Sequence, residues 1–443
     1  MALIRPFDGM RYAPAAVGDL ASVVGAPYDV ITAPAQADFY ARSPFNVVRL
    51  ELGCARPGDQ PTDNRYTRAA ATYQSWLRDR IIVPDGEPSL YVYDEGFSLN
   101  GRWLKRRSLV AAVRLANWEE GEILPHERTL PRAKADRLEL LAATHTQFSP
   151  LLAFYDDPGG VLATLADVAA TDPLARLTVA PDQIAASALE HRLWRSADPA
   201  VVAELSRALR TTQLYIADGH HRYETALTYR DQQRAAGAGP NAPSEFVLIG
   251  LVEASDPGLT VQPTHRIVTG LETIDVERAQ RQLSGWFEIE RRPFDAAAGD
   301  AVANLVDVSG PATTLGVLGL ERNVVHQLRL RPSVDLTKLL PDVPEALRPI
   351  DTVILQRLIL DPVFGLAADE LGAGERVRFT RDPAEAVRAY LAGDAQLAFF
   401  LQPTPISQIR AASQAGVRMP QKTTYFWPKP LTGLVFFDHD RAW

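Results

Sequence analysis

Short apolar runs and stretches of helical periodicity follow one another along the whole chain. Runs or alternation of apolar residues predict strands over 45–52, 90–93, 108–113, 148–155, 214–217, 245–253, 314–318, 326–330, 397–401 and 433–437. Apolar positions spaced three and four apart predict helices over 65–80 and 131–144, and a short helix after Thr404-Pro405. Asn100-Gly101 predicts a hairpin turn. The pattern favours an α+β fold with mixed sheets and flanking helices.

One strand-turn-helix stretch carries the densest chemistry. Leu214 to Ala217 form an apolar run too short for a helix, and Asp218-Gly219 is a turn dipeptide. Beyond the turn, Tyr223, Ala226 and Leu227 have the spacing of a helix face. A carboxylate, two imidazoles and a guanidinium therefore lie where a strand ends and a helix begins.

The first turn of a helix leaves backbone N–H groups unpaired and carries partial positive charge. With His220, His221 and Arg222 added, this stretch is suited to receive a phosphate. Asp218 is the negative group beside that site, placed to accept a proton from an attacking hydroxyl or to hold a metal. The alternative is an ordinary N-cap and tight turn with structural histidines.

Further candidate residues come from four other segments. Lys134 and Arg137 are three apart on the helix over 131–144, where they either grip one anion or pair with Asp136 or Glu139. Tyr28 and Asp29 follow Pro27 in a loop that either borders a site or is a structural turn. His265-Arg266 precedes an apolar dipeptide, and the loop over 418–429 carries lysine, hydroxyl and aromatic side chains suited to closing over a ligand.

Two acidic and histidine-containing segments are weaker candidates. His126-Glu127 lacks the second histidine of a zinc-protease helix, so that class is excluded. Asp438-His439-Asp440 resembles a metal site, but its place near the C-terminus favours a frayed tail.

Composition narrows the classes of function. The 443 residues suffice for two to four domains, and we expect segments 1–110, 111–270, 271–396 and 397–443, the third of them accessory. A net charge of −8 argues against nucleic-acid or anionic-membrane partners. The single cysteine, Cys54, excludes an internal disulfide, and no apolar run of membrane-spanning length occurs, so we expect a cytoplasmic protein. P-loop, Rossmann, protein-kinase and Gly-x-Ser-x-Gly motifs do not occur.

Five motifs, in order, carry a resemblance to a known family. They are Pro27-Tyr28-Asp29-Val30-Ile31, Lys134-x-Asp136-Arg137-Leu138, Ala217-Asp218-Gly219-His220-His221-Arg222-Tyr223-Glu224-Thr225-Ala226, Pro263-Thr264-His265-Arg266 and Arg418-Met419-Pro420-Gln421-Lys422-Thr423-Thr424-Tyr425-Phe426. From near the first residue to the last strand, the chain resembles a widespread prokaryotic family described as a conserved domain of unknown function. It departs from that family at 144–148, where a smaller, glycine-containing loop is expected.

Some members of that family resemble SerK-type kinases of free L-serine, which implies a small-molecule phosphotransferase using pyrophosphate or a nucleotide. The resemblance implies Asp218 as the base, Glu127 as a metal ligand or second acid-base, and a phosphate site completed by Lys134, Arg137, Arg266 and Lys422. Tyr28, Asp29, His265 and Thr423 are expected to contact substrate, and Mg²⁺ to bind at Asp218. The Asp-Gly-His-His-Arg segment is similar to the phosphate turn of ParB and sulfiredoxin-like folds. We expect the motifs to meet in one cleft, and a homo-oligomer is one option for the assembly. The competing hypothesis is a ParB-type nucleotide-binding regulatory module without amino-acid kinase activity.

Overall fold

A computed structural model of the chain describes residues 2–182, 184–271, 274–293, 313–367 and 376–443. The chain divides into two compact units. The first contains Met1–Pro125, Thr129–Thr260 and Pro428–Trp443, and the second contains His126–Arg128 and Val261–Trp427. The first unit therefore takes its residues from both ends of the chain.

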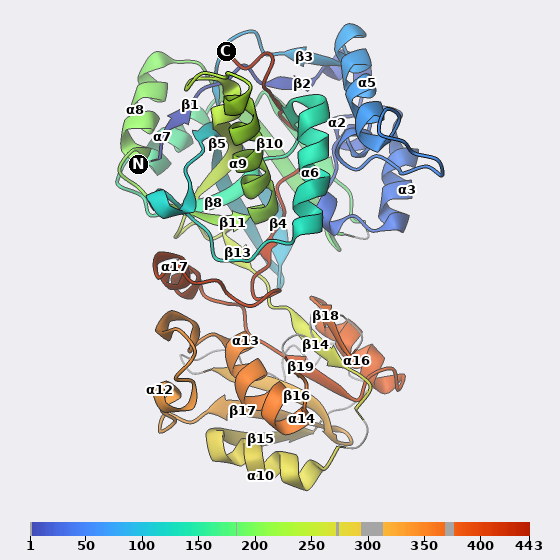
Figure 1. Cartoon of the computed structure of the whole chain (residues 1–443), viewed down its shortest axis with the longest axis vertical. Helices are drawn as coiled ribbons and strands as arrows, with labels where there is room; N and C mark the ends of the chain where they lie inside the picture. Colours follow the sequence, from blue (N-terminus) through green and yellow to red (C-terminus); the bar gives the residue numbers. More distant parts are fainter. Residues whose placement is uncertain (1, 183, 272–273, 294–312, 368–375) are drawn as a thin grey trace. The chain divides into compact units, whose positions relative to one another are not determined.

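The first unit combines one large sheet with helices and two short strand pairs (Figure 1). Its strands are β1 (Ile4–Arg5), β2 (Met10–Tyr12), β3 (Ile82–Pro84), β4 (Leu90–Leu99), β5 (Arg102–Arg114), β6 (Ile123–Leu124), β7 (Thr146–Gln147), β8 (Leu151–Tyr155), β9 (Ala175–Val179), β10 (Leu189–Ser196), β11 (Leu214–Asp218), β12 (Phe246–Glu253) and β21 (Phe437–Asp438). Its helices are α1 (Pro14–Val17), α2 (Leu20–Val23), η1 (Tyr28–Val30), α3 (Ala33–Arg42), α4 (Val48–Glu51), α5 (Arg65–Arg78), η2 (Trp118–Glu120), α6 (Pro131–Thr144), α7 (Val161–Val168), α8 (Pro199–Leu209), α9 (His220–Ala235) and η3 (Pro243–Glu245).

The large sheet has nine strands, eight of them in the order β6-β11-β8-β12-β5-β4-β10-β9, with β1 paired to β5. Two neighbouring pairs, β6 with β11 and β8 with β12, are parallel, whereas the other printed pairs of this sheet are antiparallel. Apolar side chains of α7, α8 and α9 pack against the sheet, and Tyr223 of α9 is fully buried. Burial of these faces supplies the main driving force for folding. The sheet is therefore mixed, as expected.

A buried ion pair fixes the segment that returns from the second unit. Arg106 of β5 is fully buried and contacts the carboxylate of Glu95 on β4. The same guanidinium donates a hydrogen bond of 2.6 Å to the carbonyl of Pro428. Because Pro428 opens the last segment of the first unit, this bond sets where the following residue, Lys429, enters.

The second unit contains a six-stranded sheet in the order β15-β17-β16-β19-β14-β18. Its strands are β13 (Thr260–Val261, which begins at the boundary), β14 (His265–Val268), β15 (Phe287–Pro293), β16 (Thr314–Glu321), β17 (Val324–Leu330), β18 (Val377–Thr380), β19 (Leu397–Phe400) and β20 (Phe426–Trp427). Its helices are α10 (Val276–Trp286), α12 (Leu336–Leu339), η5 (Glu345–Leu347), α13 (Asp351–Ile354), the π-helix η6 (Leu355–Leu360), α14 (Asp361–Phe364), α16 (Pro383–Leu391) and α17 (Ile406–Gln414). Packing of α16 on β14, β16 and β19 forms one of its cores.

The α+β class with mixed sheets and flanking helices is confirmed, and so are most of the predicted elements. The helix over 131–144 has the predicted bounds, and the hairpin turn places Asn100 and Gly101 at φ 51° and 73°. The strand predicted over 433–437 is wrong, because Gly433 at φ 99° lies in a turn and only Phe437 of these residues belongs to a strand, β21. The strand predicted over 45–52 is also wrong, because α4 occupies Val48–Glu51. Asn46 accounts for the difference, since its side chain accepts from the N–H of Val48 and donates to the carbonyls of Ser22 and Val24. The side chain thus starts a helical turn and ties it to α2.

The two units differ from the four expected segments. Strands from 1–110 and from 111–270 hydrogen-bond to each other in one sheet, so they share one core. The chain end is also more ordered than a frayed tail, because Asp438 is buried and accepts a hydrogen bond of 2.9 Å from Tyr73. Burial lowers the pKa of the neighbouring His439 to about 3.

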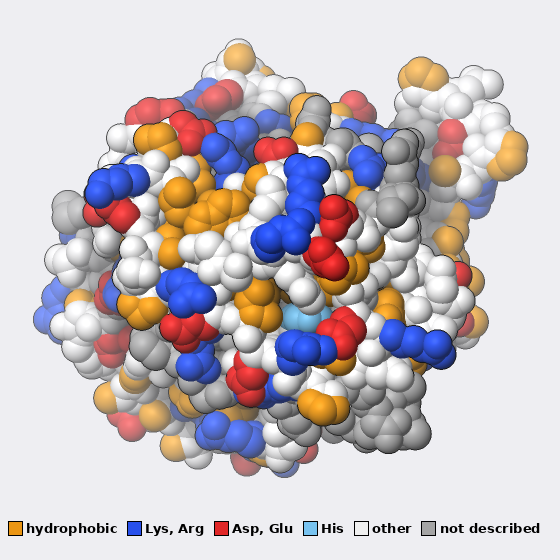
Figure 2. All heavy atoms as spheres, turned by 90° about the horizontal axis from the view of Figure 1, so that it is seen from below, with side chains coloured by type: hydrophobic (Ala, Val, Ile, Leu, Met, Phe, Trp, Pro, Cys, Tyr) orange, Lys and Arg blue, Asp and Glu red, His pale blue; other side chains and the backbone are white. Residues whose placement is uncertain are grey.

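Figure 2 views one face of the molecule, on which acidic, basic and hydrophobic side chains lie interspersed. The described residues on this face do not form a continuous basic stripe of the kind that follows a nucleic-acid backbone. Among the described residues, no helix combines the length and the hydropathy needed to cross a bilayer.

Candidate active site

The predicted strand-turn-helix is present as β11, Gly219 and α9. Gly219 has φ 97°, and a Cβ there would lie 2.9 Å from Cγ of Leu151, so this turn requires glycine. The N-cap residue of α9 is Gly219, which has no side chain to cap the first turn; the backbone N–H groups of that turn include those of the buried His220 and half-buried His221. The N-terminus of a 16-residue helix with a glycine N-cap therefore follows directly after Asp218.

Asp218 lies at the end of β11 between two cations. It is 9% exposed and pairs with Arg222 at 2.9 Å. It also contacts Nζ of Lys429, a buried lysine from the last segment of the first unit. The register between β11 and β8 shifts beside Asp218, so the strand is irregular where it delivers this carboxylate.

A second carboxylate shares the lysine. Oδ2 of Asp29 in η1 lies 3.3 Å from Nζ of Lys429, and its side chain is 39% exposed. Burial acts to raise the pKa of Asp29, but the charges of Lys429 and Arg222 outweigh it and hold that pKa below its usual value. Lys429 thus bridges an accessible carboxylate, that of Asp29, and a buried one, that of Asp218.

His221 lies close enough to Asp29, Asp218 and Glu224 for their charges to act on its imidazole ring. Burial lowers its pKa, although Asp29, Glu224 and Asp218 act in the opposite direction. Nε2 of His221 accepts a hydrogen bond of 2.9 Å from the N–H of Leu130, so this nitrogen is unprotonated. The ring therefore leaves Nδ1 as its protonated nitrogen.

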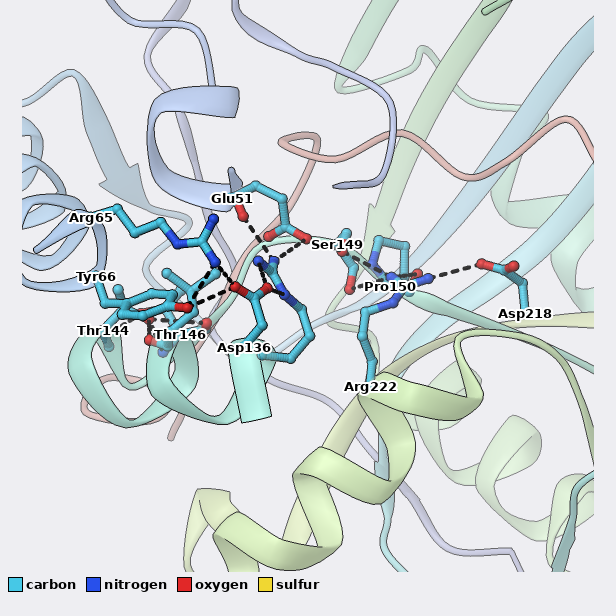
Figure 3. A network of polar contacts seen from close by, with 12 residues as sticks. Glu51, Arg65, Tyr66, Asp136, Thr144, Thr146, Ser149, Pro150, Asp218 and Arg222 are labelled. Carbon is cyan, nitrogen blue, oxygen red and sulfur yellow. Dashed lines mark hydrogen bonds and ion pairs between the residues drawn. The ribbon is translucent and has the colours of Figure 1, made fainter. Parts of the chain in front are cut away.

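Arg222 links the turn of α9 to the start of β8 (Figure 3). It points from α9 between Asp218 and the Ser149-Pro150 segment, donating at 2.9 Å to Oγ of Ser149 and to the carbonyl of Pro150. These bonds hold the guanidinium plane in a fixed direction, which favours recognition of an oxyanion.

Arg137 on α6 is a second buried arginine near Arg222, and it too is held by polar contacts. It is 5% exposed, contacts the carboxylate of Asp136, and lies 3.5 Å from Oε1 of Glu51. The ring of Tyr28 packs 4.1 Å from its guanidinium, and burial raises the pKa of that tyrosine to about 12. A cavity of about 50 Å³ lies between Arg137, Arg222, Glu51 and Ser149, with the space of a few water molecules.

Lys134 lies on the outer part of this group. Its Nζ is 2.8 Å from Oε2 of Glu224. Burial acts to raise the pKa of Glu224, but the hydrogen bond from Lys134 and further polar contacts outweigh it and hold that pKa below its usual value. Of the alternative pairings expected on this helix, Arg137 with Asp136 is present.

The remaining predicted residues belong to the second unit. The backbone of Glu127 forms an isolated parallel β-bridge with Met419. The guanidinium of Arg266 donates to the carbonyls of Thr264 and Lys422. Nδ1 of His265 accepts a hydrogen bond of 3.2 Å from the N–H of Leu401, and burial lowers the pKa of His265 to about 4. The hydroxyl of Thr423 lies 2.9 Å from that of Thr352. The roles expected for Glu127, His265, Arg266, Lys422 and Thr423 stay predictions.

Lys429 is the residue that sequence reasoning missed. It stands at the end of the aromatic loop over 418–429, where Lys422 drew the attention as part of a longer motif. The only local signal was a second lysine just before the last apolar run. Its partners, Asp29 and Asp218, are 400 and 211 residues away in the sequence, so no local spacing indicates the contact.

The described residues contain no group of three or more His, Cys, Asp or Glu side chains placed to hold a metal ion. Two carboxylates, Asp29 and Asp218, do share the neighbourhood of Lys429. One or two carboxylates together with substrate phosphates are a common Mg²⁺ ligand set. The pair therefore fits a Mg²⁺ that arrives with a phosphate-bearing ligand.

The departure from the family pattern at 144–148 also has a structural reading. His145 ends α6 in the left-handed conformation at φ 50°, which favours glycine. Its N–H caps the helix on the carbonyl of Leu141 at 2.8 Å. The backbone shape that glycine favours is therefore retained with a histidine.

Comparisons with known proteins complete the description. A family model described as protein of unknown function (DUF1015) matches residues 4–335. No curated protein matches the chain.

Among solved structures, the chain is similar to a conserved hypothetical protein from Pyrococcus furiosus, at 12% identity and TM-score 0.30, covering 72% of this chain and 90% of that one. It is similar to a free serine kinase in complex with AMP, at 11% identity and TM-score 0.31, covering 72% and 86%. It is also similar to a C-terminally truncated SbnI from Staphylococcus aureus, at 12% identity and TM-score 0.30, covering 74% and 82%.

Proposed function

The chain belongs to the DUF1015 family of proteins of unknown function, and we propose that it is a small-molecule phosphotransferase that phosphorylates the hydroxyl of free L-serine. The donor in this proposal is pyrophosphate or a nucleotide. The observation that carries the proposal is the N-terminus of α9, with Gly219 as its N-cap, beside Asp218, Arg222 and Lys429. Phosphoryl transfer needs mainly positioned cations and an oriented nucleophile; this cluster supplies the cations and a carboxylate that can orient the serine hydroxyl.

The phosphate end of the donor is assigned to the first turn of α9. Backbone N–H groups there are oriented by the helix, and its dipole favours negative charge. Arg222 contributes a guanidinium whose direction is fixed by Ser149 and Pro150. Because these donors are held before the ligand arrives, little reorganisation accompanies charge development during transfer.

The acceptor hydroxyl is assigned to Asp218. Its carboxylate contacts the cations Arg222 and Lys429, and in this proposal it accepts the hydroxyl proton as the oxygen attacks phosphorus. Asp29, the more exposed carboxylate, is suited to the ammonium group of the amino acid. The transferred group moves from the donor phosphate oxygen to the serine oxygen, and the donor leaves one phosphate shorter.

Mg²⁺ is part of the proposal through Asp29 and Asp218, the two carboxylates that fit it. When bound, the ion would neutralise negative charge on the donor oxygens. Lys429 contacts both carboxylates and so holds them close to each other.

Product formation tests this assignment. Purified chain is incubated with L-serine, Mg²⁺ and, separately, pyrophosphate, ATP, ADP or CTP, and phosphoserine is measured by mass spectrometry. We expect phosphoserine with at least one donor and a loss of about 10²–10⁴-fold for Asp218→Asn. Asp63→Asn, which changes an acid that is 77% exposed, is the matched control and should keep full activity.

Absence of phosphoserine with every donor, from protein shown to be folded, would reject the proposal. Tight binding of a nucleotide without transfer to serine would instead favour the ParB-type regulatory module.

A further inference from the structure

The second unit contains a pocket of its own, of about 620 Å³, lined only by residues of that unit. Pockets of 300–1,000 Å³ are typical of sites for small organic ligands. Its walls come from residues within 342–360, from Arg128, from β14 and β18, and from residues 418–421. The phosphotransferase proposed above assigns no step to these lining residues, although the family resemblance implies a phosphate-binding role for one of them, Arg266.

Positive charge dominates the pocket. Four arginines line it, namely Arg128, Arg266, Arg357 and Arg418, against a single described acidic residue, Asp342. Asp342 pairs with Arg357 at 2.7 Å, so that pair is internally balanced. The described lining therefore contains four positively charged side chains and one negatively charged side chain, in a protein that is acidic as a whole.

Arg266 is the most informative of the four. It stands on β14, between β19 and β18 in the six-stranded sheet, and is 4% exposed. Its guanidinium donates to the carbonyls of Thr264 and Lys422 and lies 5.1 Å from the ring centre of Phe379. Within the described residues these partners are all uncharged, and burial lowers the pKa of Arg266 to about 9.

A buried cation without an acidic partner is costly, because neither water nor a counter-ion compensates its charge. A structural role alone would be served by an uncharged side chain of similar volume. An anion bound in the pocket would provide a negative charge beside the guanidinium of Arg266, which lines the pocket. The guanidinium fork suits carboxylate or phosphate oxygens.

The remaining wall is apolar. Val343, Leu347, Leu360 and Met419 are buried residues of this lining, and Phe379 adds an aromatic ring. One side is formed by η6, a π-helical stretch over Leu355–Leu360. Such widened turns are rare and often occur at functional sites. An anion with an apolar body matches this wall better than a bare inorganic ion.

We propose that the second unit binds a small organic oxyanion, a phosphate monoester or a carboxylate with an apolar body, between Arg128, Arg266 and Arg418. The oxyanion pairs with the guanidiniums, and the body packs on Leu347, Phe379 and Met419. This site is additional to the transferase cluster and does not depend on the function proposed for that cluster.

Hydrogen exchange of the full chain, read by mass spectrometry, locates the ligand. Phenyl phosphate and benzoate represent the two oxyanion classes, and phenol and inorganic phosphate represent the body and the charge alone. We expect slower exchange over 342–360 with phenyl phosphate or benzoate. Phenol and inorganic phosphate should bind at least about tenfold more weakly, since each lacks one of the two interactions.

The double variant Arg128→Ala/Arg418→Ala should weaken binding by at least about tenfold without altering the fold, because Arg128 is exposed and Arg418 half-buried. Arg388→Ala, which removes a 67% exposed arginine outside the pocket lining, is the control and should bind normally. Arg266→Met is a further variant in which binding should be lost.

The proposal is overturned if neither oxyanion probe slows exchange over 342–360, if phenol or inorganic phosphate protects as well as they do, or if the double variant keeps wild-type affinity. Protection over 218–224 reports the separate cluster on α9. The two proposals can therefore fail independently in one experiment.

Discussion

Replacing Lys429 by methionine tests the arrangement around Asp218 most directly. Methionine retains much of the side-chain volume but removes the cation that bridges Asp29 and Asp218. The Asp218 contact is buried on both sides, with 7% and 11% of the side chains exposed, so its loss is expensive. Breaking a buried pair typically costs 3–5 kcal/mol, but Asp218 retains Arg222, so we expect about 2–3 kcal/mol from this contact.

Asp29 adds little to this total. Its side chain is 39% exposed, and water screens such a pair to about 1 kcal/mol or less. The expected loss of unfolding free energy for Lys429→Met is therefore about 2–4 kcal/mol at pH 7. Lys105→Met is the control, because Lys105 is 55% exposed and lies 3.5 Å from Asp94, a pair expected to contribute under about 1 kcal/mol.

The pH dependence gives this prediction a second test. The pKa of Asp29 is lowered in the folded protein, so its pairing stabilises above the unfolded value near 4 and is lost as pH falls through the lower folded value. Urea unfolding followed by circular dichroism should show a wild-type-to-variant difference that is largest at pH 7 and smaller at pH 3. A difference under about 0.5 kcal/mol at pH 7, or one that grows on acidification, would refute the reasoning.

Three further predictions concern the surrounding scaffold. Gly219→Ala should lower the unfolding free energy by about 1–3 kcal/mol in urea titrations, because φ 97° and Leu151 both oppose a Cβ; an unchanged midpoint would show that the turn relaxes freely. Arg106→Leu should cost about 3–5 kcal/mol by stranding buried Glu95, and Glu95→Leu in the same chain should recover much of it; equal stability of the single and double variants would contradict this. Burial, aided by the charge of Arg106, lowers the pKa of His191 to about 3, so below pH 6.5 the unfolded state alone takes up this proton and stability falls by about 1.4 kcal/mol per pH unit. His191→Asn should flatten that slope in urea titrations at pH 6.5 and pH 4.5, and an unaltered slope would exclude His191 as its source.

The sequence predictions were correct where local interactions determine the structure and wrong where contacts distant in the sequence determine it. Around Gly219 the strand, the turn and the helix all depend on local patterns, and β11 and α9 appear where the spacing placed them. At 45–52 an alternating pattern suggested a strand, but hydrogen bonds from Asn46 to residues more than twenty positions away selected a helical turn. A tertiary contact there overrode a weak local preference.

The candidate site divides in the same way. Asp218 and Arg222 are four residues apart at the start of a helix, so their ion pair is a local consequence of the sequence. Other contacts depend on how α4, α6 and the start of β8 pack, and no spacing in the sequence indicates them. They are the approach of Glu51 to Arg137 and the hydrogen bonds from Arg222 to Ser149 and Pro150. For Lys134, the partner is Glu224 on another helix, not the neighbours that its own helix offers.

The sequence by itself determined the α+β class, the glycine turn before α9 and the identity of most groups placed near Asp218, because helix and strand periodicity and turn chemistry act over a few residues. Only the tertiary structure decided that Lys429 would bridge Asp29 and Asp218, and that Arg266 would be buried in a pocket with three other arginines. Those contacts join segments that are far apart in the chain, and their energies depend on burial, which exists only after the sheets and helices have packed.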